Sequence, residues 1–272
     1  MGVTSKKVLF INSEMSPFLP DSKIAAICRN LPQGIQERKR EIRSFMPKYG
    51  CINERRNQLH EVIRLSGMNI IISDVDRPLV IKVASIASAR LQVYFLDNDD
   101  YFRRKQVDRD EAGVFFPDND ERAIFFAKGI LETVKKLRWA PDIIHCHGWI
   151  SQLLPLYLKR CYKDDPIFSD SKVVLSLYGD ALGESFAGDF ASKVIAGGVS
   201  GEDLEAFEKP DGINLAKLAI SYSDAVIFAD RSAEEALGAY CAEKDLKVLP
   251  FAPASYEDGT YIDEYDSLYT SL

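Results

Sequence analysis

The sequence has no pair of closely spaced cysteines. Its five cysteines, Cys28, Cys51, Cys146, Cys161 and Cys241, are odd in number and scattered along 272 residues. A disulfide framework needs a regular, even set, and a structural zinc site needs clustered thiolates. The sequence therefore predicts neither, and it predicts buried thiols that serve only in packing.

Long apolar runs are also absent. The run that follows Lys6 and Lys7, residues 8–11, is far too short for a signal-peptide core or for a membrane span of about 20 residues. We therefore expect a cytoplasmic protein that uses no membrane. The formal charge of −7 and the pI of about 5.2 disfavour nucleic acid as a partner, and they favour neutral or cationic ligands.

Glycine is missing from the first loop, residues 13–22. This loop follows an apolar run, residues 7–12, and precedes a helical pattern at about residues 23–37 that Ser22 is placed to cap. Strand, loop and helix in this order open a doubly wound fold. A dinucleotide site would need glycines here so that phosphates approach the backbone, so phosphate binding at this loop is disfavoured.

Apolar periodicity and turn signals predict the remaining elements and an α/β fold. We expect a Rossmann-like, doubly wound parallel sheet with inserted β-hairpins, in one domain of residues 1–251 followed by an acidic, tyrosine-rich tail of residues 252–272. Strands are expected at residues 41–46, 91–96, 172–178, 224–229 and 247–251, and hairpins are expected between residues 60 and 97. Helices are expected at residues 121–137, 151–158, 214–221 and 232–240. Irregular segments are expected at residues 97–122 and 194–203.

Two of the three histidines and one of the two tryptophans gather after a predicted buried strand that begins near Ile143. Because loops at the carboxyl ends of parallel strands open onto the ligand crevice, we expect His145, His147 and Trp149 at the functional site. The alternative is structural, with Trp149 covering the core and the imidazoles bonded to neighbouring loops. No third ligand accompanies the histidines, so no metal site is expected.

Five segments, in order, resemble the amino-terminal half of bacterial glycogen synthases and plant starch synthases. They are residues 7–18 (KVLFINSEMSPF), 46–50 (MPKYG), 95–102 (FLDNDDYF), 118–122 (DNDER) and 141–149 (PDIIHCHGW), and weaker similarity continues through 173–178 and 216–235. The resemblance implies the N-terminal half of a GT-B glycosyltransferase that moves glucose from ADP-glucose to an α-1,4-glucan without a bound cofactor. It also implies substrate-binding roles for Glu14, Tyr101, Asp118, Asn119, His145, His147, Trp149 and Tyr178.

The chain departs from the family pattern at several positions. The family's Lys-x-Gly-Gly-Leu corresponds to residues 20–24 (PDSKI), where Lys23 keeps a charge without the glycines. The family's His-x-His-Asp-Trp-His carries Gly148 and Ile150 here, and its Ile-His-Asn becomes Leu177, Tyr178 and Gly179. The sequence also ends where the family's second domain begins. We therefore assign no catalytic residue and expect weak or no glucosyl transfer by the isolated chain.

Two alternatives remain open at this point. Beside the transferase, the chain could be a non-catalytic glucan-binding or regulatory protein, or a scaffold that uses the tail of residues 252–272 to bind a partner. An α-glucan or a nucleotide sugar is the ligand that the resemblance suggests. A half-cleft leaves an apolar face, so we also expect a homodimer or a separate partner chain that covers it.

Overall fold

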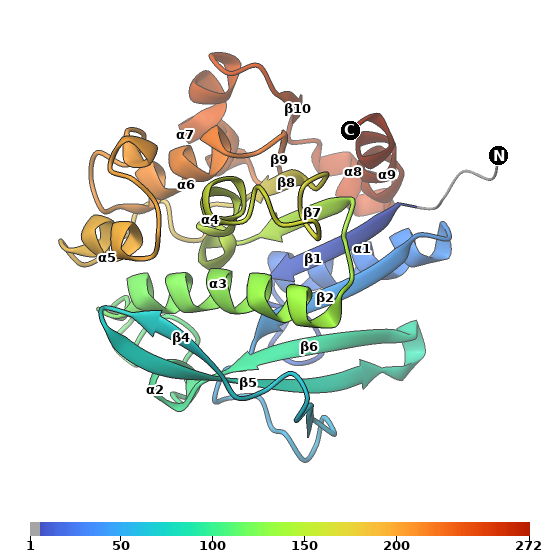
Figure 1. The fold of residues 1–272 in the computed structure, drawn as a ribbon. Coiled ribbons are helices and arrows are strands. Elements are labelled where there is room, and N and C mark those ends of the chain that lie inside the picture. The colour runs from blue at the N-terminus through green and yellow to red at the C-terminus, as the bar shows by residue number, and fades with distance from the viewer. Residues whose placement is uncertain (1–5) are drawn as a thin grey trace.

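A ten-stranded sheet runs through the protein, whose computed structural model describes residues 6–272. Residues 1–5, part of the predicted domain of residues 1–251, lie outside the described residues. The strand order is β10-β9-β8-β7-β1-β2-β6-β5-β3, and β4 pairs with β5. Figure 1 shows α3 and α4 on the near face of the sheet and α1 behind it, so helices cover both faces.

The strands of the parallel part lie close to the predicted positions. They are β1 (Lys7–Asn12), β2 (Glu41–Pro47), β6 (Leu91–Asp97), β7 (Ile143–His147), β8 (Lys172–Leu177), β9 (Ala225–Phe228) and β10 (Lys247–Leu249). In the sheet these strands lie in the order β10-β9-β8-β7-β1-β2-β6, and each pairs in parallel with the next. Strand β10 forms the edge beside β9. Strands β1, β7, β8 and β9 are buried on both faces over nearly their whole length, which is why their sequences read as continuous apolar runs, whereas the edge strand β10 is largely exposed.

Strands are added to the sheet on opposite sides of β1, although all of these strands run parallel. From β1 the chain moves to β2 on one side, whereas β7 pairs with the other side of β1, with Asn12 opposite His147. This arrangement is the topological switch point of a doubly wound sheet, where the ends of neighbouring strands diverge and leave a crevice. The predicted Rossmann-like α/β fold is confirmed.

The inserted hairpins are present between β2 and α3. Strands β4 (Met68–Ile72) and β5 (Val75–Ile86) pair in antiparallel fashion, and β5 continues into an antiparallel pair with β6. The short strand β3 (His60–Glu61) completes this edge by pairing with β5. The hairpins extend the sheet on the side away from β7, so they do not contribute to the switch point.

The helices follow the strands in the expected alternation. The longer helices are α1 (Lys23–Glu37), α3 (Asn119–Leu137), α4 (Leu154–Cys161), α6 (Gly212–Ser221), α7 (Arg231–Ala242) and α9 (Tyr261–Ser271), and the shorter ones are α2 (Asp99–Phe102), α5 (Phe190–Ala196) and α8 (Pro253–Asp258). The predicted cap of α1 is present, because the backbone N–H of Ala25 donates to Ser22 Oγ at 3.0 Å.

Several local expectations were wrong. The acidic segment contains the short helix α2, and α5 extends into the segment expected to be a loop at residues 194–203. The helix expected from residue 151 is a 3₁₀ turn at Trp149–Ser151 before α4. Cys51 and Cys161 are exposed, in contrast to the other three thiols.

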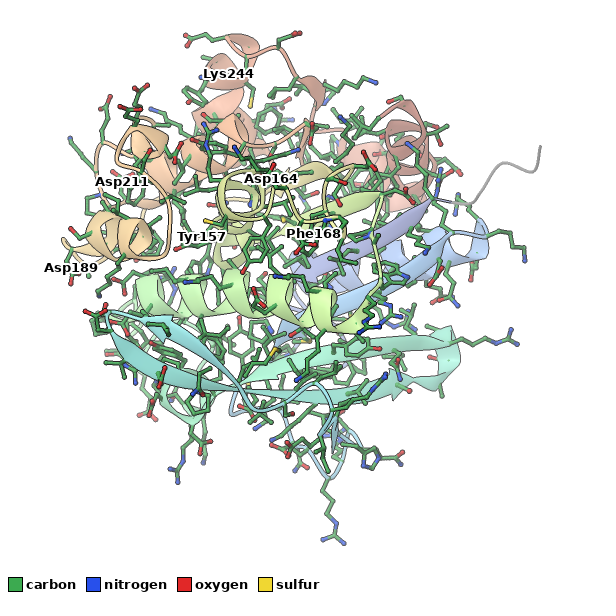
Figure 2. All side chains as sticks on the ribbon, viewed as in Figure 1. Tyr157, Asp164, Phe168, Asp189, Asp211 and Lys244 are labelled. Atoms are coloured by element: carbon green, nitrogen blue, oxygen red, sulfur yellow. The ribbon has the colours of Figure 1, made fainter. Side chains whose placement is uncertain are left out.

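The face of α4 that points toward α3 carries Tyr157 (Figure 2). The Lys128 ammonium of α3 lies 5.9 Å from the centroid of the Tyr157 ring, and the ring itself is fully buried. The contact shows how α3 and α4 pack together over the near face of the sheet. Among residues 6–272, no helix is long and apolar enough to cross a membrane.

The C-terminal residues fold back over α1. Gly34 of α1 leaves room for Ile262 of α9, because a Cβ at Gly34 would come within 2.7 Å of the Ile262 side chain. Lys6 Nζ donates to the carbonyl oxygen of Tyr269 at 2.8 Å, and Arg40 pairs with Asp266. These contacts join α9 to the first part of the chain. The division into a domain of residues 1–251 and a tail remains a prediction.

Candidate functional site

A cavity of about 390 Å³ opens at the carboxyl ends of β1, β8 and β9. Its walls come from the loop after β1, the first turn of α1, the loop after β8 and the start of α7: Glu14, Ser22, Lys23, Ile24, Tyr178, Gly179, Asp180, Asp230 and Ser232. A larger cavity of about 580 Å³ lies between α6, α7 and residues 202–208, where several lining residues precede β9 or β10. We place the site in the first cavity, because ligands of such sheets bind beyond the carboxyl ends of the strands.

Carboxyl groups dominate the charge of this cavity. Glu14, Asp180 and Asp230 line it, and Lys23 is its one lining cation among the described residues. The pKa of Asp180 is raised to about 6, mainly by burial and also by the charges of Glu14 and Asp108, while the hydrogen bond from the backbone N–H of Trp149 lowers it. Burial also raises the pKa of Glu14, although Ser22 Oγ donates to Glu14 Oε2 at 2.5 Å. A polar, weakly acidic cavity of this kind suits a ligand rich in hydroxyl groups.

Gly148 explains how Asp180 reaches this position. Gly148 has φ of +79°, and a Cβ there would lie 2.1 Å from Ser13 Oγ and 3.3 Å from Asp180 Oδ2. The absence of a side chain lets the loop after β7 pass close to the loop after β1. Trp149 N–H then donates to Asp180 Oδ2 at 2.9 Å. A carboxylate from the β8 loop therefore occupies space beside the position where the resembling family carries an aspartate.

His145 and His147 lie side by side in the core. Their ring centroids are 3.9 Å apart, and both residues are fully buried. His145 Nδ1 and Nε2 are hydrogen-bonded to the hydroxyls of Tyr269 and Ser176, at 2.6 and 2.8 Å. Burial lowers the pKa of both imidazoles, that of His147 to about 3, so both are neutral near pH 7. Neutral, buried rings support the structural interpretation of His145.

His147 connects the core to the cavity. Its Nδ1 is hydrogen-bonded to the Tyr178 hydroxyl at 2.9 Å, and Tyr178 lines the cavity wall. Within the described residues, His147 Nε2 and the nearby Ser13 Oγ have no hydrogen-bond partner. Both are buried at the end of the β1–β7 pair, where the N–H of Ser13 donates to the carbonyl oxygen of His147 at 3.0 Å. The position of Tyr178 is thus held by a histidine that does not itself reach the cavity.

Trp149 is held by aromatic neighbours and is not a free platform. Its ring centroid lies 5.1 Å from that of Phe115 and 5.8 Å from that of Phe186, and the residue is 5% exposed. A hydrogen bond from its side chain lowers the pKa of the Asp108 carboxyl, but burial raises that pKa by more, so the net shift is upward. Trp149 therefore fixes the 103–118 segment against the loop after β8.

The other predicted residues form a separate cluster under the 103–118 segment. Tyr101 OH donates to Glu121 Oε2 at 2.8 Å, Arg104 holds both oxygens of Asp118, and Asn119 Nδ2 donates to the Asp108 carbonyl oxygen at 2.9 Å. Asp118 does not cap α3 through its side chain. Tyr101, Asp118 and Asn119 do not line the cavity, whereas Glu14 and Tyr178 do. A binding role for any of these residues remains a prediction.

Sequence reasoning did not select Asp180 or Asp230. Asp180 follows β8 at the carboxyl edge, and Asp230 caps α7 by accepting a hydrogen bond from the N–H of Ser232 at 2.8 Å. The signal was present, because an aspartate two or three residues after a buried strand lies at that edge. Within residues 6–272, no group of three or more His, Cys, Asp or Glu side chains is placed to hold a metal ion.

Comparison with known proteins assigns the chain to a family. Residues 7–246 match the starch synthase catalytic domain. The chain is 43% identical over 173 residues to a glycogen synthase of Chlorobium limicola, which covers 63% of this chain and 35% of that protein. It is 34% identical over 254 residues to a glycogen synthase of Chlorobaculum parvum, which covers 91% of this chain and 51% of that protein. The chain thus spans about half or less of the curated relatives it matches.

The fold matches about half of a solved starch synthase catalytic domain. The catalytic domain of Starch Synthase IV from Arabidopsis thaliana, bound to ADP and acarbose, superimposes with a TM-score of 0.74 at 17% sequence identity. The match covers 91% of this chain and 51% of that one, and it establishes the GT-B type of architecture. With residues 7–246 matched by sequence and the sheet matched in space, the chain belongs to the family of the starch synthase catalytic domain.

Proposed function

We propose that the chain binds the end of an α-1,4-glucan in the Glu14–Asp180 cavity, as the glucan side of a glucosyl transfer from a nucleotide sugar. By itself it transfers glucose weakly or not at all. The observation that carries the proposal is the cavity at the carboxyl ends of β1, β8 and β9, lined by Glu14, Tyr178 and Asp180, in a chain of this family. The Glu14 and Asp180 carboxyl groups suit the hydroxyl groups of a sugar, which donate hydrogen bonds to them.

The same lining argues against strong binding of a nucleotide diphosphate. Three carboxyl groups surround one ammonium in the cavity, and the loop of residues 13–22 has no glycine to bring its backbone close to a phosphate. Transfer needs groups that stabilise the leaving diphosphate, and their absence costs orders of magnitude in rate. ADP-glucose remains the donor that the family suggests, at low efficiency.

A direct test compares binding with transfer. The purified chain is titrated with maltotriose and then incubated with labelled ADP-glucose and glycogen. We expect saturable maltotriose binding that Asp180→Ala abolishes and Asp76→Ala leaves intact, because Asp76 is an exposed aspartate on the distant β5. Incorporation of label should stay at or near background. A chain that transfers glucose at rates typical of enzymes, at least about 1 per second, contradicts the proposal.

A second candidate is a non-catalytic glucan-binding or regulatory protein. The acidic lining favours it, because this lining accepts a neutral glucan and repels a diphosphate. The two functions separate in the same assay. The discriminating condition is the addition of cell extract, which can supply a separate partner chain. Transfer that appears with extract, saturates with donor and disappears in Asp180→Ala favours the transferase, and glucan binding with no transfer from any nucleotide sugar, even with extract, favours the second candidate.

A further inference from the structure

A second cavity of about 430 Å³ lies between α1 and the α8–α9 hairpin. One wall is the outer face of α1, with Lys23 and Asn30, and the other is formed by Tyr256 of α8, the turn that follows it and Ile262 of α9. Lys23 lines this groove and the Glu14–Asp180 cavity alike, so the walls of the two spaces share its side chain. We call this second space the tail groove.

The walls of the tail groove combine apolar surface with planar polar groups. Tyr256 and Ile262 present a partly exposed ring and methyl groups, while Asn30 and Glu257 add an exposed amide and an exposed carboxylate. Sugars are recognised by this combination, since their C–H faces pack on rings and their hydroxyls bond to planar polar groups. The volume falls within the roughly 300–1,000 Å³ range of ligand sites.

The charge of the tail groove favours a neutral ligand. Its cation is Lys23, and its carboxylates are Glu257 and Asp258. The Lys23 ammonium lies 4.3 Å from the centroid of the Phe251 ring and 5.2 Å from that of Tyr256, so the aromatic rings already engage this cation. An anionic ligand would meet two carboxylates and one engaged ammonium.

The tail groove is held in shape by contacts within the C-terminal hairpin. The Tyr256 and Tyr261 rings stack at 4.9 Å, and the Tyr256 hydroxyl is hydrogen-bonded to that of Tyr265 at 2.6 Å. Gly259, with φ of +82°, makes the turn between α8 and α9, and no atom outside the turn crowds it. A groove fixed before binding spends little free energy on ordering.

We propose that the tail groove is an extension subsite, which binds the inner glucose units of an α-glucan whose end occupies the Glu14–Asp180 cavity. The proposal rests on the proposed function, because it places the same ligand in two neighbouring spaces that share the Lys23 side chain in their walls. It adds a role for residues 252–272, which lie outside the segment of residues 7–246 matched by the family. The chain then prefers long glucans over short ones.

The test uses two sugars of different length. Calorimetric titration of the full chain with maltose and with maltoheptaose should show at least roughly tenfold tighter binding of the longer sugar. Asn30→Ala, Glu257→Ala and Tyr256→Ala should each weaken maltoheptaose severalfold and leave maltose unchanged. Asn69→Ala, on the exposed edge of β4, is the matched control and should change neither affinity.

The outcomes separate the two proposals. The extension subsite is overturned if both sugars bind with equal affinity, or if the variants bind maltoheptaose like the unmodified chain. Either result leaves the proposed glucan binding in the Glu14–Asp180 cavity intact. Failure of both sugars to bind overturns both. If Tyr256→Ala fails to fold by circular dichroism, the decision rests on Asn30→Ala and Glu257→Ala, which change exposed residues.

Discussion

Gly148 is the residue on which the geometry of the site most depends. Its φ of +79° is strained for any other residue, and a Cβ would meet Ser13 Oγ at 2.1 Å. We predict that Gly148→Ala lowers the free energy of unfolding by about 2–4 kcal/mol, measured by urea denaturation. Gly188→Ala is the control, because no atom lies near its Cβ position. Equal stability of the two variants would show that the close approach of the loops has no energetic weight.

Asp180 gives the site a defined pH dependence. Burial raises its pKa from 3.8 to about 6, so the folded state holds its proton more tightly than the unfolded state does. Stability from this group is fully present below pH 3.8 and is lost as the pH rises through 6. We predict that Asp180→Asn gains about 1–3 kcal/mol over the unmodified chain between pH 4 and pH 7.

The measurement is urea denaturation at several pH values, with Asp76→Asn as the reference for an exposed aspartate. A difference between Asp180→Asn and the unmodified chain that does not change with pH contradicts the assignment.

At this scale the sequence predicted part of the site. Glu14 and Tyr178 were expected near the cleft and do line the cavity. Trp149 was expected either as a ligand platform or as a cover for the core, and it is 5% exposed. Asp180 was not expected, because its role depends on the close passage of Gly148 and Ser13, a contact between distant segments.

Helix α9 connects the end of the chain to the central strand. The Tyr269 hydroxyl is hydrogen-bonded to His145 Nδ1 at 2.6 Å, in a fully buried position. We predict that Tyr269→Phe costs about 1–3 kcal/mol, because it leaves a buried imidazole nitrogen unpaired. Thermal or urea unfolding measures this loss of stability. Tyr240→Phe is the control, since the Tyr240 hydroxyl is hydrogen-bonded to Ser221 at the surface. If both changes cost the same, the buried bond is not specific to α9.

Elements with a clear period were predictable and short ones were not. Strand β1 and helix α1 were placed within a residue or two, because continuous apolar runs and a capping serine mark them. Helix α2 was missed because four residues carry no periodicity, and it depends on Asn98 accepting hydrogen bonds from the N–H groups of Asp100 and Tyr101. Helix α5 was missed because the glycines after it suggested a loop.

For the whole molecule, the alternation of strands and helices predicted a doubly wound parallel sheet with inserted hairpins, and both are present. The strand order and the switch point beside β1 were not predicted, because alternation alone does not say which side of β1 a later strand joins. The packing of α8 and α9 across α1 was beyond sequence reasoning, because it joins residues more than 200 positions apart, such as Arg38 and Asp263. The tail groove is a product of that packing.

The state of assembly remains a prediction at this scale. A second copy or a partner chain that covers the open cavity face would contact exposed apolar side chains. Val114, which is 61% exposed beside the aromatic cluster of Phe115 and Trp149, is such a side chain. We expect light scattering to give the mass of a homodimer, and Val114→Asp to shift it to the 30.6 kDa monomer. A clean monomer for the unmodified chain removes the homodimer and leaves only a separate partner.

One measurement tests the central claim most directly, namely that the cavity accepts a neutral glucan in preference to a nucleotide sugar. The chain is titrated calorimetrically with maltoheptaose and, separately, with ADP-glucose, at the same pH and ionic strength. We predict saturable binding of maltoheptaose that Asp180→Ala removes, and binding of ADP-glucose that is at least roughly tenfold weaker. Tight ADP-glucose binding without glucan binding would contradict the account, and it would identify the cavity as a donor site.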